Sequence, residues 1–228
     1  MKLGLAFSGS GESAANAHCF LEELEVGGLP LGMLSASSLA ALPAFLWARG
    51  FAAAQVEALM EDFFHARTPH GGLARLERAG ALAGSCKLPV ALCSVDVETG
   101  VAAIFCDSLR SDAWNLKVYP LAGNERAALG AALCPYGESP PQRWAQLRLC
   151  DFAARYGCPF FPLRMAGMEK LLAASFAGGG RPAQIAADTI AALTAKRADV
   201  FCQVEGPSAG EVRAQARALL PECYEKLL

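Results

Sequence analysis

Ser38 lies in a sequence pattern that could support nucleophilic catalysis. The segment from Leu29 to Leu42 reads as an apolar strand, a serine-containing turn and the start of a helix. Such a turn exposes the serine as a nucleophile, and the N–H groups of the next helix can stabilise an oxyanion. The usual pattern is G-x-S-x-G, but here Ala36 and Ala40 flank Ser38. The spacing predicts a nucleophile elbow at Ser38, and a serine that only caps the helix is the alternative.

A glycine-rich turn, S-G-S-G, follows the first apolar run of the chain. Gly9 and Gly11 lack a Cβ, so the N–H groups of Gly9, Ser10 and Gly11 can point at a bound oxygen. Similar turns bind phosphate in nucleotide-binding proteins, and others only connect a strand to a helix. A phosphate-binding loop would need a Lys-Ser/Thr pair that is absent, and G-x-G-x-x-G has Ala14 at its third glycine. Nucleotide binding therefore stays open only as an alternative.

A base for Ser38 must come from elsewhere in the chain. Histidine is the usual base, but His18, His65 and His70 cannot complete the order serine, acid, histidine of α/β-hydrolases. Asp151 ends an apolar run and is the economical alternative. An aspartate in water has a pKa near 3.9 and is a poor base, but partial burial among apolar neighbours would raise that pKa. We therefore expect a Ser38–Asp151 dyad, and a turn aspartate without catalytic function is the alternative.

Composition narrows the function classes. The chain has 228 residues, 54% of them hydrophobic, and a net charge of −2. We expect one domain over residues 1–228 and no binding of nucleic acid. The first apolar run is too short for a signal peptide or a membrane span. Nine scattered cysteines without a C-x-x-C pair predict reduced thiols in a cytoplasmic protein, with no disulfide framework and no metal site.

Apolar runs and helical patterns alternate along the chain. This predicts an α/β fold of three layers, in which helices flank a mostly parallel central sheet. A proline- and glycine-containing turn is expected at 68–72 and a looser region at 109–141. Strands are expected at 3–7, 32–36, 89–95, 101–105, 146–150 and 198–204, and helices at 14–26, 38–49, 54–65, 163–174, 183–195 and 210–219.

These segments together resemble the patatin-like phospholipases, in particular bacterial single-domain members with degenerate motifs. The family's oxyanion motif G-G-G-x-R-G is similar to G-S-G-E-S-A at 9–14, and its nucleophile segment to residues 36–51. Its mid-chain pattern, which ends T-D-x-x-T-G, is similar to residues 89–100. Its D-G-G/A motif and the following N-x-P and P-L-R resemble residues 151–164, and a late A-D-V strand lies at 198–200. The five motifs occur in the family's order.

The resemblance implies a lipid acyl hydrolase or carboxylic esterase without a cofactor or metal. Asp151 would take the Ser38 proton, and N–H groups of Gly9, Ser10 and Gly11 would hold the oxyanion. The substrate would be an acyl lipid or a similar ester, with residues 109–141 as a lid; peripheral contact with a membrane is left open.

Several positions depart from the family pattern. Ser13 stands where the family has arginine, alanines flank the serine, and Phe152 replaces a glycine beside Asp151. The alternative is therefore a catalytically impaired homologue that binds a lipid or a protein partner.

Overall fold

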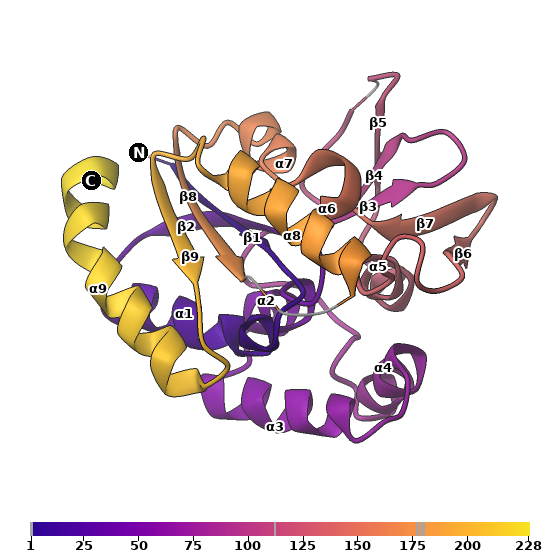
Figure 1. Cartoon of the computed structure of the whole chain (residues 1–228), viewed down its shortest axis with the longest axis horizontal. Coiled ribbons are helices and arrows are strands. Elements are labelled where there is room, and N and C mark those ends of the chain that lie inside the picture. Colours follow the sequence, from indigo (N-terminus) through magenta and orange to yellow (C-terminus); the bar gives the residue numbers. More distant parts are fainter. Residues whose placement is uncertain (1, 112, 177, 179–180) are drawn as a thin grey trace.

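The protein is built on one central sheet. The computed structural model describes residues 2–111, 113–176, 178 and 181–228. In this part of the chain, nine strands form a mostly parallel sheet in the order β5-β4-β3-β2-β1-β8-β9, with β7 beside β3 and β6 beside β7 (Figure 1). The strands are β1 (Leu3–Ser8), β2 (Leu31–Ala36), β3 (Val90–Asp96), β4 (Ala102–Phe105), β5 (Leu116–Tyr119), β6 (Gln142–Trp144), β7 (Leu147–Asp151), β8 (Lys170–Phe176) and β9 (Val200–Val204).

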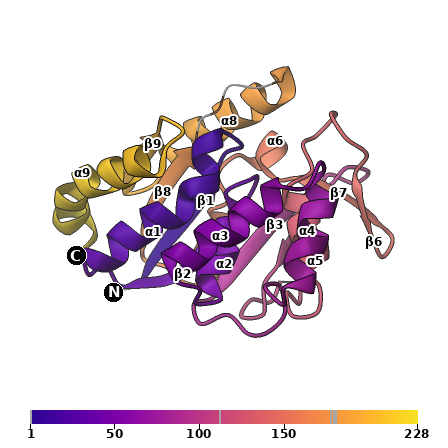
Figure 2. The same cartoon turned by 90° about the horizontal axis from the view of Figure 1, so that it is seen from below.

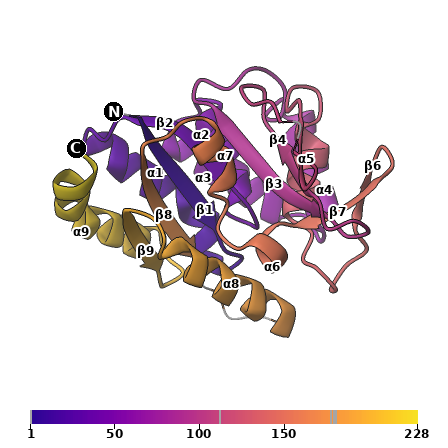
Figure 3. The same ribbon diagram turned by 90° about the horizontal axis from the view of Figure 1, so that it is seen from above.

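Helices cover both faces of this sheet, as Figures 2 and 3 show from opposite sides. One face carries a short 3-10 helix η1 (Glu12–Asn16), α1 (Ala17–Val26), α2 (Ala41–Ala48), α3 (Ala53–Phe64), α4 (Pro69–Arg78), α5 (Glu125–Ala132) and α9 (Ala209–Leu227). The other carries α6 (Ala153–Tyr156), α7 (Phe161–Met165) and α8 (Pro182–Ala195). The expected three-layer α/β fold with a mostly parallel sheet is confirmed.

Strand β1 lies in the middle of the sheet and packs on both helical layers. Leu3, Leu5 and Phe7 belong to the larger apolar cluster, whereas Ala6 belongs to the cluster on the opposite face. This division arises because successive side chains of a strand point to opposite faces of the sheet. All six residues of β1 are buried, which explains its continuous apolar run.

The helix expected at 163–174 is wrong. Helix α7 ends at Met165, Gly167 adopts a positive φ of 71°, and β8 then runs from Lys170 to Phe176. Leucine and alanine favour helices in isolation, but here they form a buried strand that pairs in parallel with β1 and β9. Tertiary pairing and burial decide the structure of this segment.

The turn expected at 68–72 is instead the beginning of α4. The Thr68 hydroxyl accepts a 3.1 Å hydrogen bond from the Gly71 N–H, and Pro69 occupies the first turn of the helix. Proline at this position costs no intrahelical hydrogen bond, because the first N–H groups of a helix have no such partner.

The region 109–141 is more ordered than expected. It contains β5, which pairs in parallel with β4, and α5, in which Ala128, Leu129 and two further alanines are buried. Helix α5 therefore belongs to the core, and β5 extends the central sheet. Residue 112 lies outside the described part of the chain.

The remaining expected elements are present with shifted bounds. The helix expected at 14–26 begins as η1, the one at 38–49 starts at Ala41, and the one at 210–219 continues to Leu227. Two short elements, α6 and β6, were not expected. Among the described residues, no helix is both long and apolar enough to cross a membrane.

Candidate active site

The site forms where two strands meet end to end beside β3. The first half of β3 pairs in parallel with β2, with Leu92 opposite Ala36. The second half pairs antiparallel with β7, with Ser94 opposite Asp151. Because β4 occupies the other edge of β3, β2 and β7 share one edge and run toward each other. Their final residues therefore converge, and this brings the turn after β2 next to Asp151.

Ser38 occupies a tight turn between β2 and α2. Its φ is 59°, in the left-handed region that non-glycine residues rarely adopt. The Ser37 N–H donates to Phe7 O at 3.1 Å, and the Ala40 N–H donates to Gly9 O at 3.4 Å. The turn is thus tied on both sides of Ser38 to the end of β1. A serine held in strained geometry between a strand and a helix is typical of nucleophile elbows.

Asp151 receives three hydrogen bonds. The Ser38 hydroxyl donates to Oδ2 at 2.7 Å, and the Ser38 N–H donates to Oδ1 at 3.1 Å. The Ala153 N–H donates to Oδ1 at 3.2 Å. The carboxylate is therefore fixed in orientation, with one oxygen against the hydroxyl of Ser38. Proton transfer from a hydroxyl to a carboxylate requires this distance and direction.

Burial, and to a smaller extent the negative charge of Asp188, raises the pKa of Asp151, while hydrogen bonds from Ser38 and the Ala153 N–H oppose the rise; the resulting pKa is about 6. Phe152 is completely buried beside it. The carboxyl group remains ionised at neutral pH but is a stronger base than an aspartate in water. The expected effect of apolar neighbours on this residue agrees with the structure.

The glycine-rich turn lies beside the elbow, but one of its N–H groups is already occupied. The Ser10 N–H donates to Asp188 Oδ1 at 3.1 Å, and the Ser10 hydroxyl donates to the two oxygens of the same carboxylate at 3.2 and 3.0 Å. Gly9 has a φ of 120°, and a Cβ there would collide with Phe176 O. The turn is therefore held by β8 on one side and by Asp188 on the other.

Sequence reasoning did not identify Asp188. It is 5% exposed, and burial raises the pKa of its carboxyl group. One feature of the sequence could have identified it: Asp188 is the sole charged residue of α8. A lone acid in an alanine-rich helix that covers a sheet is expected to have a partner, since burial of an unpaired charge is costly.

A cavity of about 470 Å³ opens above Ser38 and Asp151. Its walls come from the end of α3, the end of α5, the segment 135–139 and the first turns of α8. Phe64 and Tyr136, which are 52% and 57% exposed, are the large apolar side chains of its rim. Arg181 and Glu138, an ion pair with an N–O distance of 3.3 Å, add charge to the wall.

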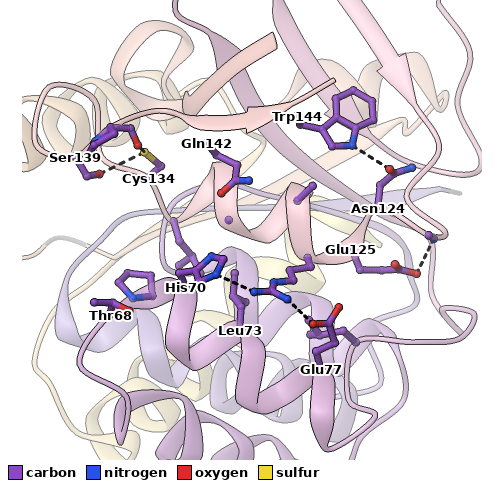
Figure 4. A pocket seen from close by; sticks show the side chains of 18 of the residues that line it. Thr68, His70, Leu73, Glu77, Asn124, Glu125, Cys134, Ser139, Gln142 and Trp144 are labelled. Carbon is purple, nitrogen blue, oxygen red and sulfur yellow. Dashed lines mark hydrogen bonds and ion pairs between the residues drawn. The ribbon is translucent and has the colours of Figure 1, made fainter. Parts of the chain in front are cut away.

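A neighbouring cavity of about 490 Å³ lies between α4, α5 and β6 (Figure 4). Ser38 and Asp151 do not line it, and its polar groups bond to one another. Arg126 contacts His70 Nε2 at 2.9 Å and Glu77 Oε2 at 2.6 Å, and the Trp144 Nε1–H donates to Asn124 Oδ1. The cavity that Ser38 and Asp151 line, the dyad cavity, is therefore the candidate active site.

Asp96, part of the mid-chain motif, supports the site through β7. Its Oδ1 accepts the Arg148 N–H at 3.1 Å, and its Oδ2 accepts the Thr99 hydroxyl at 2.6 Å. Burial raises the pKa of Asp96, but these hydrogen bonds outweigh burial and lower it overall. The residue thus links the turn after β3 to the beginning of the strand that carries Asp151.

In the described part of the chain, no group of three or more His, Cys, Asp and Glu side chains is placed to hold a metal ion. No protein-family model matches the chain, and a search of curated proteins finds no match.

Proposed function

We propose that the protein is a serine hydrolase of carboxylic esters that uses Ser38 and Asp151 as its catalytic pair. The observation that carries this proposal is the 2.7 Å hydrogen bond from the Ser38 hydroxyl to the buried Asp151 carboxylate. The positive φ of Ser38 is a second support, because a strained turn at a serine is typical of nucleophile elbows.

In the proposed first step, Asp151 accepts the Ser38 proton while Ser38 Oγ forms a bond to the ester carbonyl carbon. The tetrahedral intermediate then breaks its bond to the alcohol oxygen, and the alcohol leaves with the proton from Asp151. Water then attacks the acyl-enzyme, again with Asp151 as the base. This releases the carboxylic acid and restores the Ser38 hydroxyl.

We propose an acyl lipid or a similar apolar ester as the substrate class. The apolar rim formed by Phe64 and Tyr136 supports an acyl chain in the dyad cavity. The order of the motifs and the three-layer α/β fold support a patatin-like phospholipase. A cytoplasmic location is part of the proposal, because the nine cysteines, all within the described residues, are free thiols.

One observation favours a second function, that of an impaired homologue that binds a lipid or a protein partner. The Ser10 N–H, expected to stabilise the oxyanion, is hydrogen-bonded to Asp188. Removal of one oxyanion donor typically costs about 3 kcal/mol in the activation barrier. Binding without turnover is therefore the second candidate.

Labelling with a fluorophosphonate, followed by intact mass and peptide mapping, tests the proposal. We expect a single adduct on Ser38 that is absent in Asp151→Asn. Absence of an adduct in the folded wild-type protein and also in folded Asp188→Ala would contradict the hydrolase proposal and favour the binding function. An ester and phospholipid screen would follow a positive result.

A further inference from the structure

Asp188 binds the glycine-rich turn at residues 9–11, the predicted oxyanion loop. These contacts occupy groups that a reacting substrate would need. Its carboxylate accepts one hydrogen bond from the Ser10 N–H at 3.1 Å and others from the Ser10 hydroxyl. Turns that precede a helix bind anions through N–H groups of this kind. The chain thus supplies an anion of its own to the loop predicted to bind the oxyanion.

A second contact covers the same loop. Gly178, between β8 and α8, packs so closely that a Cβ on it would collide with Gly11 Cα. Helix α8 packs mainly against α6 and also contacts β8 and β1. The loop is therefore enclosed from the side of α8, and Asp188 is the charged group that reaches it from that helix.

Two consequences oppose stabilisation of an oxyanion in this arrangement. While the Ser10 N–H is bonded to Asp188, it cannot donate to an oxyanion in good geometry. The carboxylate also places negative charge beside the site where negative charge would develop, in a buried environment that screens poorly. When Asp188 leaves Ser10, the N–H becomes free to donate and the electrostatic opposition weakens with distance.

We propose that Asp188 is an autoinhibitory residue: its carboxylate occupies the Ser10 amide of the oxyanion loop, and turnover requires this contact to break. The proposal rests on the proposed hydrolase function. The Ser38 hydroxyl already donates to Asp151, but the oxyanion loop is closed by Asp188 of the chain itself. A substrate carbonyl oxygen that binds the Ser10 N–H must displace Asp188.

The test compares fluorophosphonate labelling rates of wild type, Asp188→Ala and Asp188→Asn at pH 7.5. The phosphoryl oxygen of the probe requires the same donors as an ester oxyanion. We expect Asp188→Ala to be labelled on Ser38 at least about tenfold faster than wild type, given the usual contribution of one oxyanion donor. Asp188→Asn should be intermediate, because its amide oxygen still accepts the Ser10 N–H but carries no charge. The asparagine variant also keeps the test valid if the alanine variant fails to fold.

Thr189→Ala is the matched control. Thr189 is the next residue of α8, is exposed, and donates its hydroxyl to Ile185 O within the helix. Its labelling rate should equal that of wild type. Folded Asp188 variants labelled at the wild-type rate or more slowly would overturn the proposal.

Hydrogen exchange of peptides that contain residue 10 provides a readout independent of activity. We expect the Ser10 amide to lose protection in Asp188→Ala, and unchanged protection would overturn the proposal. Loss of protection without Ser38 labelling in any variant would refute both inhibition and the hydrolase function. Loss of protection with labelling that is present but not accelerated would refute inhibition alone.

Discussion

The Ser38 hydroxyl and the Asp151 carboxylate lie 2.7 Å apart, although 113 residues separate them in the chain. The contact exists because β2 and β7 end opposite each other on one edge of β3. Asp96 holds the beginning of β7 through the Arg148 N–H, so the register of that strand sets the position of Asp151. The proposed chemistry depends on this meeting of two strand ends.

Substitution of Ser38 by alanine should abolish fluorophosphonate labelling and lower ester hydrolysis by at least about a thousandfold, because the nucleophile is lost. Ser37→Ala is the control, since the Ser37 hydroxyl is buried without a hydrogen-bond partner in the described residues. Rates of p-nitrophenyl ester hydrolysis would test both. Equal activity of Ser38→Ala and wild type would exclude Ser38 as the nucleophile.

The rate of Ser38 labelling should depend on pH through Asp151. Its pKa is about 6 because of burial, and the carboxylate form is the base. The rate should therefore rise with pH, reach half its maximum near pH 6 and level off above about pH 7. Labelling rates between pH 4.5 and 8 give the profile. A flat profile over this range would contradict a role for Asp151 as the base.

Asp151→Asn should increase stability at neutral pH while it removes activity. The folded-state pKa, about 6, exceeds the ordinary value of 3.8, so the folded protein binds this proton more tightly than the unfolded chain. Stability from this group is thus complete at low pH and is lost as pH rises through about 6. Asparagine avoids this loss, which is on the order of 3 kcal/mol for a shift of about two pH units. Urea unfolding at pH 8 should favour the variant, with the difference much reduced at pH 4.

Asp188→Asn should move the acidic limb of the pH profile to lower pH. The negative charge of Asp188 helps to raise the pKa of Asp151, and its removal makes ionisation of Asp151 easier. The midpoint of the labelling profile should therefore fall below that of wild type. Thr189→Ala should keep the wild-type midpoint. A midpoint unchanged in Asp188→Asn would show that the two carboxylates do not interact.

Gly9→Ala should be strongly destabilising, by more than about 3 kcal/mol, because a Cβ would strike Phe176 O and φ is 120°. Gly28→Ala is the matched control. Gly28 also has a positive φ, 71°, but a Cβ there would meet no atom within 4 Å. That variant should lose only about 1 kcal/mol through backbone strain. Similar urea midpoints for the two variants would contradict the close packing of the loop on β8.

Local patterns in the sequence predict much of the fold. The apolar run of β1, the serine turn after β2 and the aspartate at the end of β7 each follow from short-range spacing and period. The class of the fold follows from their alternation with helical segments. The pairing of Ser38 with Asp151 was a hypothesis, because local patterns in the sequence do not show which two turns lie close together in the folded protein.

Three features were decided by tertiary structure alone. Residues 170–176 form a strand although leucine and alanine favour helices, because this segment pairs between β1 and β9. The rise in the pKa of Asp151 was expected from its apolar neighbours in the sequence, but its extent, to about 6, depends on burial by packing and on the charge of Asp188. Asp188 reaches Ser10 across 178 residues of chain, and only the position of α8 on the sheet makes this contact. Local spacing thus determines which residue types end strands and turns, whereas burial and long-range pairing determine which of them meet.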